Sequence, residues 1–133
     1  MAAVLYVDDE ATIRRVVQLW LQRHGVTVLT AAGVSDALDI LATEIVDGVF
    51  IDAWLEDGTG MDVYEWIRAR RPALERNVAF VTGDTVSRTV TERLNATGRP
   101  VLAKPFDLDA VRNIAAGWAR GSGGAAVRPD VRD

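Results

Sequence analysis

The sequence contains no cysteine and a single histidine, His24, among its 133 residues. Without cysteine there is neither a disulfide framework nor a thiolate zinc site, and one histidine leaves no imidazole cluster for a transition metal. No apolar run approaches the roughly 18 residues that span a bilayer, and the amino terminus lacks the basic-then-apolar layout of a signal peptide. We therefore expect no membrane segment and a cytoplasmic location.

Acidic residues outnumber basic residues, 19 to 15. The net charge of −4 and the pI near 5.0 disfavour a nucleic-acid-binding surface, because such surfaces usually carry a basic patch that neutralises phosphates. The chain has one lysine, Lys104, and all its other basic residues are arginines. Its 49% hydrophobic content with 26% charged residues is typical of a folded chain, and its length is that of one domain.

Short apolar runs alternate five times with stretches of helical periodicity. The runs are rich in β-formers and predict strands at residues 4–7, 26–29, 48–51, 78–81 and 101–103. The stretches between and after them predict amphipathic helices. We expect the second helix to keep Ile45 on its apolar face, the fourth to include Val86, and the last to be capped by Asp107.

Strands that lack strict polar alternation and are separated by amphipathic helices indicate a parallel sheet covered on both faces. Right-handed crossovers leave few topologies for five such units. We predict a flavodoxin-like, doubly wound α/β domain with strand order 2-1-3-4-5 over residues 1–120. Residues 121–133 begin with a Gly-Ser-rich stretch and are expected to form a flexible tail or linker.

Polar residues directly follow four of the predicted strands: Asp8, Asp9 and Glu10, then Asp52, Thr82 and Lys104. Ligands of open α/β sheets bind outside the carboxyl ends of the strands, so these side chains are expected to converge. Two carboxylates about 5 Å apart repel by roughly 3 kcal/mol at an effective dielectric near 20, so a cation is needed. Oxygen ligands without imidazole or thiolate suit Mg²⁺, and such a site fits phosphoryl transfer with Asp52 as nucleophile.

Each of these residues also has a purely structural interpretation. An Asp pair after a strand often caps the next helix and favours its dipole, and Thr82 can be a turn residue. Lys104 can be solvated, and Asp52 can cap the loop that follows it. Their joint position at strand ends, on the side where such folds bind ligands, favours the functional interpretation.

The stretches VLYVDDE, FIDAWLEDGTG, VTGDT and VLAKPFDLD closely resemble the response-regulator receiver domain of two-component signalling, up to about Arg120. The resemblance implies Mg²⁺-dependent transfer of a phosphoryl group from the phosphohistidine of a histidine kinase or phosphotransfer protein to Asp52, followed by a conformational switch. Such a protein is a signalling switch that catalyses only its own phosphorylation and dephosphorylation.

The resemblance also implies an ion site. Asp9 would be the direct Mg²⁺ ligand and Asp8 an outer-shell ligand. Asp52 would be both ligand and phosphoacceptor, and the backbone carbonyl of Trp54 would complete the protein's share of the coordination.

The remaining implied roles concern the phosphoryl group and the output. Thr82 would donate a hydrogen bond to it, Lys104 would pair with another of its oxygens, and Gly83 would leave room beside it. Pro105 matches the proline of the Lys-Pro step of the family, whose peptide bond is often cis. The fourth helix, fifth strand and fifth helix would form the output face for a downstream effector, and the chain could also form a homodimer.

Three positions depart from the family pattern. Glu56 stands where a proline is frequent, and Val101 replaces the usual aromatic switch residue. Trp54 is unusually large for its position two residues after the acceptor. Our hypothesis is that Trp54 shields the phosphoryl group from water and slows its hydrolysis.

Two other functions remain open on the sequence alone. The first is a phosphatase of the haloacid-dehalogenase type, which also forms an aspartyl phosphate but carries a second Asp where Trp54 stands here. The second is a receiver-like interaction module that is never phosphorylated, which Val101 and Glu56 favour. The chain could be a stand-alone receiver or a receiver excised from a larger protein such as a hybrid kinase.

Overall fold

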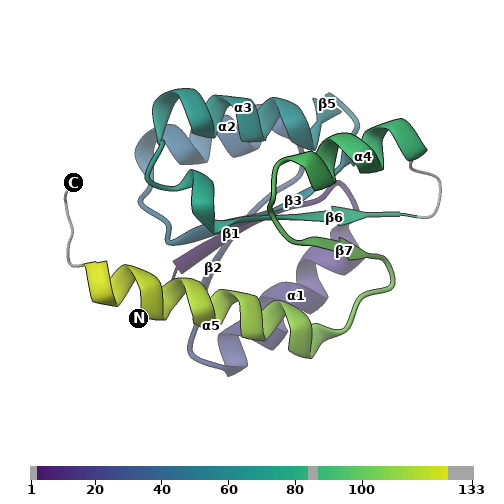
Figure 1. Cartoon of the computed structure of the whole chain (residues 1–133). Coiled ribbons are helices and arrows are strands. Elements are labelled where there is room, and N and C mark those ends of the chain that lie inside the picture. The colour runs from purple at the N-terminus through teal and green to yellow at the C-terminus, as the bar shows by residue number, and fades with distance from the viewer. Residues whose placement is uncertain (1–2, 84–86, 126–133) are drawn as a thin grey trace.

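One five-stranded sheet forms the centre of the molecule (Figure 1). The computed structural model describes residues 3–83 and 87–125, with the backbone alone from residue 120 onward. The strands of the sheet are β1 (Ala3–Val7), β2 (Thr27–Ala31), β3 (Gly48–Asp52), β6 (Val78–Thr82) and β7 (Val101–Ala103). Their order is β2-β1-β3-β6-β7, and each neighbouring pair is parallel. This is the predicted order 2-1-3-4-5, and it confirms the flavodoxin-like fold.

Helices cover both faces of the sheet. They are α1 (Ala11–Arg23), α2 (Val34–Thr43), α3 (Gly60–Arg70), α4 (Arg88–Ala96) and α5 (Leu108–Ala125), with a single 3-10 turn, η1 (Glu75–Asn77). Figure 1 shows α2, α3 and α4 on one face and α1 and α5 on the other. None of the helices in the described part of the chain has both the length and the apolar character needed to cross a membrane.

Alternate residues of the strands enter two separate cores. In β1, Leu5 and Val7 join the core beneath α2, α3 and α4, whereas Val4 and Tyr6 join the core beneath α1 and α5. All four are fully buried. Successive side chains of a strand point to opposite faces, so a strand covered on both sides is apolar throughout. This explains why the strands could be recognised as continuous apolar runs.

The layer of α1 and α5 is fixed by two tryptophans. The Nε1 of Trp20 in α1 donates to the carbonyl oxygen of Leu108 in α5 at 2.9 Å. Trp118 of α5 packs on Phe50 of β3, with ring centroids 4.7 Å apart. A Cβ at Gly48 would lie 2.0 Å from the Trp118 ring. Glycine at position 48 is therefore what lets the indole reach the sheet.

The ends of three helices bear on the sequence-based expectations. The expectation that Ile45 lies on the apolar face of the second helix is wrong. Glu44 is already extended, α2 ends at Thr43, and Ile45 is 86% exposed. Val86 lies outside the described residues, and α4 begins after Ser87, whose side chain caps it. The side-chain Oδ1 of Asp107 accepts a hydrogen bond from the amide of Asp109, as expected for the N-cap of α5.

Helix α5 continues to Ala125, whereas the sequence led us to expect a tail from residue 121. Each glycine in a helix costs about 1 kcal/mol relative to alanine, which is why the Gly-Ser stretch was predicted to be non-helical. Extending a helix that has already formed adds a hydrogen bond for each residue fixed, so it can continue through such a stretch. The rest of the predicted tail, 126–133, lies outside the described residues.

A small hairpin between β3 and α3 was not predicted. Its strands β4 (Trp54–Leu55) and β5 (Gly58–Thr59) pair in antiparallel fashion. The Asp57 carboxylate at its turn accepts hydrogen bonds from the amides of Val34 and Ser35, at 2.8 and 3.0 Å. These hydrogen bonds lower the pKa of Asp57. The hairpin therefore caps α2 and is held against the fold.

Candidate functional site

The register of the sheet places four of the predicted residues along one edge. Asp8 directly follows β1, Asp52 and Thr82 end β3 and β6, and Lys104 directly follows β7. The pairs Asp52↔Val81 and Thr82↔Ala103 show that neighbouring strands end side by side. The amide of Lys104 donates to the carbonyl oxygen of Thr82 at 2.7 Å, which extends this alignment past β7. The carboxyl ends of the strands thus meet at one site, as the sequence predicts.

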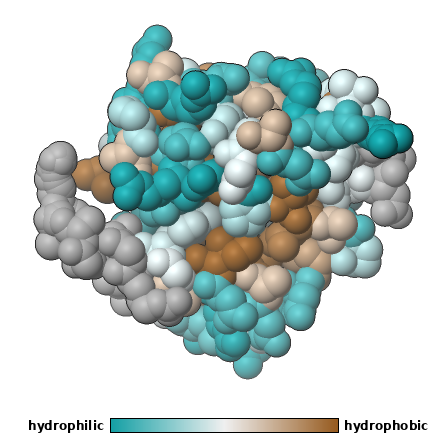
Figure 2. Space-filling view, in the orientation of Figure 1, coloured by the Kyte–Doolittle hydropathy of each residue, from teal (hydrophilic) through white to brown (hydrophobic). Residues whose placement is uncertain are grey.

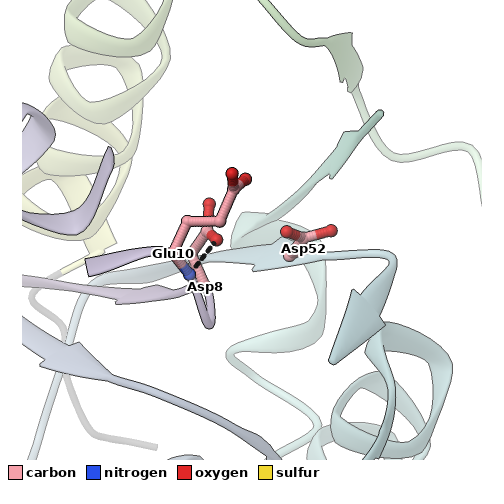
Figure 3. A group of neighbouring side chains, drawn as sticks. All are labelled: Asp8, Glu10 and Asp52. Carbon is pink, nitrogen blue, oxygen red and sulfur yellow. Dashed lines mark hydrogen bonds between the residues drawn. The ribbon is translucent and has the colours of Figure 1, made fainter. Parts of the chain in front are cut away.

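Three carboxylates gather at this edge (Figure 3). Asp8, Glu10 and Asp52 each offer one oxygen, and these oxygens lie within 4.8 Å of one another. Asp8 is fully buried and Asp52 is 5% exposed, whereas Glu10 lies at the surface. We refer to these three residues as the acid trio. Its spacing is suited to a metal ion with oxygen ligands.

Hydrogen bonds fix both the carboxylate and the backbone carbonyl of Asp8. Its carboxylate accepts from the Tyr6 hydroxyl at 3.0 Å and from the amide of Glu10 at 2.9 Å. Its carbonyl accepts from the Arg14 guanidinium at 2.7 Å. Burial, together with the adjacent Asp8 charge, raises the pKa of Tyr6, so that its hydroxyl stays protonated and keeps donating. The buried carboxylate therefore has a fixed orientation.

The Lys104 ammonium lies within contact distance of the whole acid trio. Its Nζ is 2.6 Å from Glu10 Oε1, 2.8 Å from Asp52 Oδ2 and 3.1 Å from Asp8 Oδ2. Burial lowers the pKa of Lys104, but the hydrogen bonds to Asp52, Glu10 and Asp8 outweigh burial and raise it overall. The side chain is therefore a permanent cation. Three negative charges and one positive charge leave a net charge of −2, which a divalent cation would neutralise.

The Asp52 carboxylate is buried, and its pKa is raised. Burial raises the pKa of Asp52 to about 6, although the Lys104 hydrogen bond opposes the rise; the Asp8 charge adds to it. The amide of Trp54 donates to Asp52 Oδ1 at 3.1 Å. A Cβ at Gly60 would lie 2.6 Å from the carbonyl oxygen of Asp52, so only glycine allows the loop after Asp52 to close this tightly.

Thr82 and Gly83 form the side of the site at the end of β6. Thr82 is 7% exposed and is one of the few buried polar residues of the described chain. Among the residues that the structure describes, nothing lies within 4 Å of where a Cβ at Gly83 would stand. The peptide bond between Lys104 and Pro105 is cis, as the resemblance implied.

The structure brings Asp8, Asp52 and Lys104 into direct contact, but it does not place Asp9 in the acid trio. Asp9 is half-buried in the loop after β1. Its implied place as the direct ion ligand stays a prediction, as does that of the Trp54 carbonyl. Sequence reasoning placed Glu10 at the strand end but gave it no role. The feature that could have indicated a role is its position directly after the Asp pair, with a side chain one carbon longer than that of aspartate.

Two of the three departures from the family pattern lie at the surface. The Trp54 side chain is 46% exposed, Glu56 is exposed, and Val101 is partly buried at the start of the edge strand β7.

Comparison with known proteins agrees with this geometry. Residues 4–116 match the family model of the response regulator receiver domain. The chain therefore belongs to this family, which confirms the resemblance seen in its motifs.

Individual relatives show the same membership. The response regulator protein PilR of Pseudomonas aeruginosa is 34% identical over 112 residues, which cover 84% of this chain and 25% of PilR. The chain thus spans about a quarter of that relative's length. A solved response regulator receiver protein from Pseudomonas putida is 27% identical with a TM-score of 0.79, covering 87% of this chain and 96% of that one. The response regulator TrrA of Thermotoga maritima, solved in complex with Mg²⁺-BeF, is 23% identical with a TM-score of 0.76. The match covers 89% of this chain and 99% of that one, and it shows a similarity of fold.

Proposed function

We propose that this chain is a phosphoacceptor switch in which Asp52 takes a phosphoryl group from the phosphohistidine of a histidine kinase or phosphotransfer protein in the cytoplasm. The observation that carries the proposal is the contact of Lys104 Nζ with the buried carboxylates of both Asp52 and Asp8. The Asp52 nucleophile and the Lys104 cation would then lie next to the negatively charged phosphoryl group during its transfer. Phosphoryl transfer needs positioning and charge neutralisation above all.

The transfer step involves one bond on each side. An oxygen of Asp52 attacks the phosphorus, and the nitrogen–phosphorus bond of the donor breaks. The donor imidazole keeps the electron pair of that bond and takes a proton from solvent. Thr82 would donate its hydroxyl to one phosphoryl oxygen, Lys104 would pair with another, and Gly83 would leave room beside the group.

The residues at the site fit Mg²⁺. The acid trio carries more negative charge than Lys104 compensates, and its donors are carboxylate oxygens, with neither imidazole nor thiolate among them. Asp8, Asp9, Asp52 and the Trp54 carbonyl are the residues we expect to hold the ion, Asp8 through water. When bound, Mg²⁺ would neutralise charge on the transferring group.

The output surface that we propose is formed by α4, β7 and α5. Figure 2 shows apolar surface between α4 and α5, where β7 is the edge strand of the sheet. Val101 and Leu102 of β7 are only partly buried. Lys104 follows this strand directly, so a change at the site has a short path to this surface. A downstream effector or a second copy of the chain would bind here.

The decisive experiment is incubation with Mg²⁺ and acetyl phosphate, followed by intact mass measurement. We expect one added phosphoryl group on the wild type and on Asp39→Ala, which removes an exposed carboxylate of α2, and none on Asp52→Ala. Absence of the group from the wild type would instead support the interaction module that is never phosphorylated. Multiple turnover on small phosphoesters would support the phosphatase alternative, for which Trp54 replaces the required second Asp.

A further inference from the structure

We propose that Glu10 is a positioning residue for Lys104: it provides the partner that the ammonium keeps when a divalent ion compensates the charge of Asp8 and Asp52. This inference rests on the proposed ion site and assigns a function to the one member of the acid trio that the sequence left without a role. It follows from three features of Glu10: its contact with Lys104, its exposure and its unused capping position.

The contact is the shortest that Lys104 makes within the trio. Nζ is 2.6 Å from Glu10 Oε1, compared with 2.8 Å from Asp52 and 3.1 Å from Asp8. Glu10 and Lys104 are 94 positions apart in the sequence, so the pair joins the start of α1 to the end of β7. A cation shared by three carboxylates can leave two of them and keep the third without losing its charge compensation.

Exposure decides which of the three it keeps. The Asp8 and Asp52 side chains are 0% and 7% exposed, whereas the Glu10 side chain is 57% exposed. Leaving a buried carboxylate uncompensated is costly, but a divalent ion supplies that compensation itself. Asp8 and Asp52 are therefore the carboxylates whose charge the ion would compensate, Asp8 through water, and Glu10 is the carboxylate suited to Lys104 at the rim. In Figure 3 the Glu10 carboxylate extends away from the backbone of its loop and is free of hydrogen bonds to the other residues drawn.

The helix position supports the same role. Glu10 is the N-cap residue of α1, a position where Ser, Thr, Asp or Asn commonly accept from the first amides of the helix. Its side chain makes no such capping hydrogen bond. The carboxylate is directed to Lys104 instead, and its amide donates to Asp8 Oδ1 at 2.9 Å. The backbone amide of Glu10 is thus hydrogen-bonded to Asp8, whereas its side-chain carboxylate binds Lys104.

The first test uses the fact that Lys104 is the only lysine of the chain. Labelling with ¹⁵N-lysine gives a single side-chain Nζ signal, whose proton exchange reports how firmly the ammonium is held. With saturating Mg²⁺ we expect slow exchange in the wild type and exchange faster by about fivefold in Glu10→Gln. Equal exchange in the two proteins would overturn the proposal. Glu92→Gln, which removes an exposed carboxylate paired with Arg88 on α4, should behave as the wild type.

The second test separates positioning from direct ion ligation. Calorimetric titration with Mg²⁺ should show weaker binding by about fivefold in Glu10→Gln, because Lys104 then has only the two inner carboxylates to bind. In a Lys104→Met background the same substitution should have a much smaller effect. Equal losses in both backgrounds would show that Glu10 acts on the ion itself and would overturn the proposal. If Lys104→Met fails to fold, the exchange measurement decides alone.

Neither test uses a phosphodonor, so the two proposals can fail separately. Normal Mg²⁺ binding and Lys104 exchange without phosphorylation of Asp52 would overturn the proposed function only. Phosphorylation of Asp52 with unchanged Lys104 exchange in Glu10→Gln would overturn the positioning role only. A wild type that does not bind Mg²⁺ at all would overturn both the positioning role and the proposed ion site.

Discussion

Replacing Asp52 by asparagine should stabilise the protein in the absence of Mg²⁺. Asparagine resembles the protonated carboxyl in shape and removes the negative charge that burial disfavours. The rise in the pKa of Asp52 from 3.8 to about 6 corresponds to about 3 kcal/mol between the two protonation states. At pH 7.5 the folded wild type bears this cost, whereas Asp52→Asn does not. Lys104 keeps Asp8 and Glu10 as partners in the variant.

The pH dependence fixes the sign of the effect. Between pH 3.8 and about 6 the folded wild type binds more protons at Asp52 than the unfolded chain, so its free energy of unfolding falls as the pH rises. This contribution is fully present below pH 3.8 and is lost above pH 6. The stability difference between the variant and the wild type should therefore be about 3 kcal/mol at pH 7.5 and should shrink towards pH 4.

Urea unfolding followed by circular dichroism measures this difference, with Asp39→Asn as the control for an exposed carboxylate. Adding Mg²⁺ at about 100 times its dissociation constant should stabilise the wild type by roughly 2.7 kcal/mol and nearly abolish its disadvantage. The variant lacks the Asp52 ligand and should respond much less. An Asp52→Asn protein that is no more stable than the wild type, or a difference that does not change with pH, would refute the electrostatic argument.

Three further substitutions test other parts of the structure. Gly48→Ala places a Cβ 2.0 Å from the Trp118 ring and should lower the free energy of unfolding by about 1–3 kcal/mol in urea titrations, with a shift in the near-ultraviolet signal of tryptophan. Asp57→Ala removes the cap of α2 and should lower the free energy of unfolding, measured in the same way. Trp54→Ala should shorten the lifetime of the phosphorylated protein, and an unchanged lifetime by time-resolved intact mass would show that the indole gives no protection from water.

The sheet could be predicted because its strands are buried on both faces. Runs such as residues 48–51 and 78–81 lie wholly in the core, and their apolar composition is visible without any partner. Ile45 was misplaced because periodicity alone does not detect the extended backbone of Glu44, which ends α2. The β4–β5 hairpin was missed because strands of two residues show no period at all.

The candidate site was predictable for a different reason. Parallel strands bring residues that follow them in the sequence to one edge, so Asp8, Asp52 and Lys104 could be grouped from strand positions alone. The role of Glu10 could not be found in this way. Its contact with Lys104 depends on the conformation of two long side chains and on the register between β1 and β7, which are separated in the sheet by β3 and β6.

Lys104 connects the acidic site to the edge of the sheet through two different groups. Its ammonium binds the acid trio, and its amide donates to the carbonyl oxygen of Thr82 at 2.7 Å, just past the end of β7. A displacement of the ammonium beyond the reach of the lysine side chain would therefore also move the end of β7. Because Val101 and Leu102 lie on that short edge strand, the surface that would change first is the one between α4 and α5. The proposed chemistry at Asp52 and the proposed output surface would therefore be connected through Lys104, which contacts Asp52 and directly follows β7.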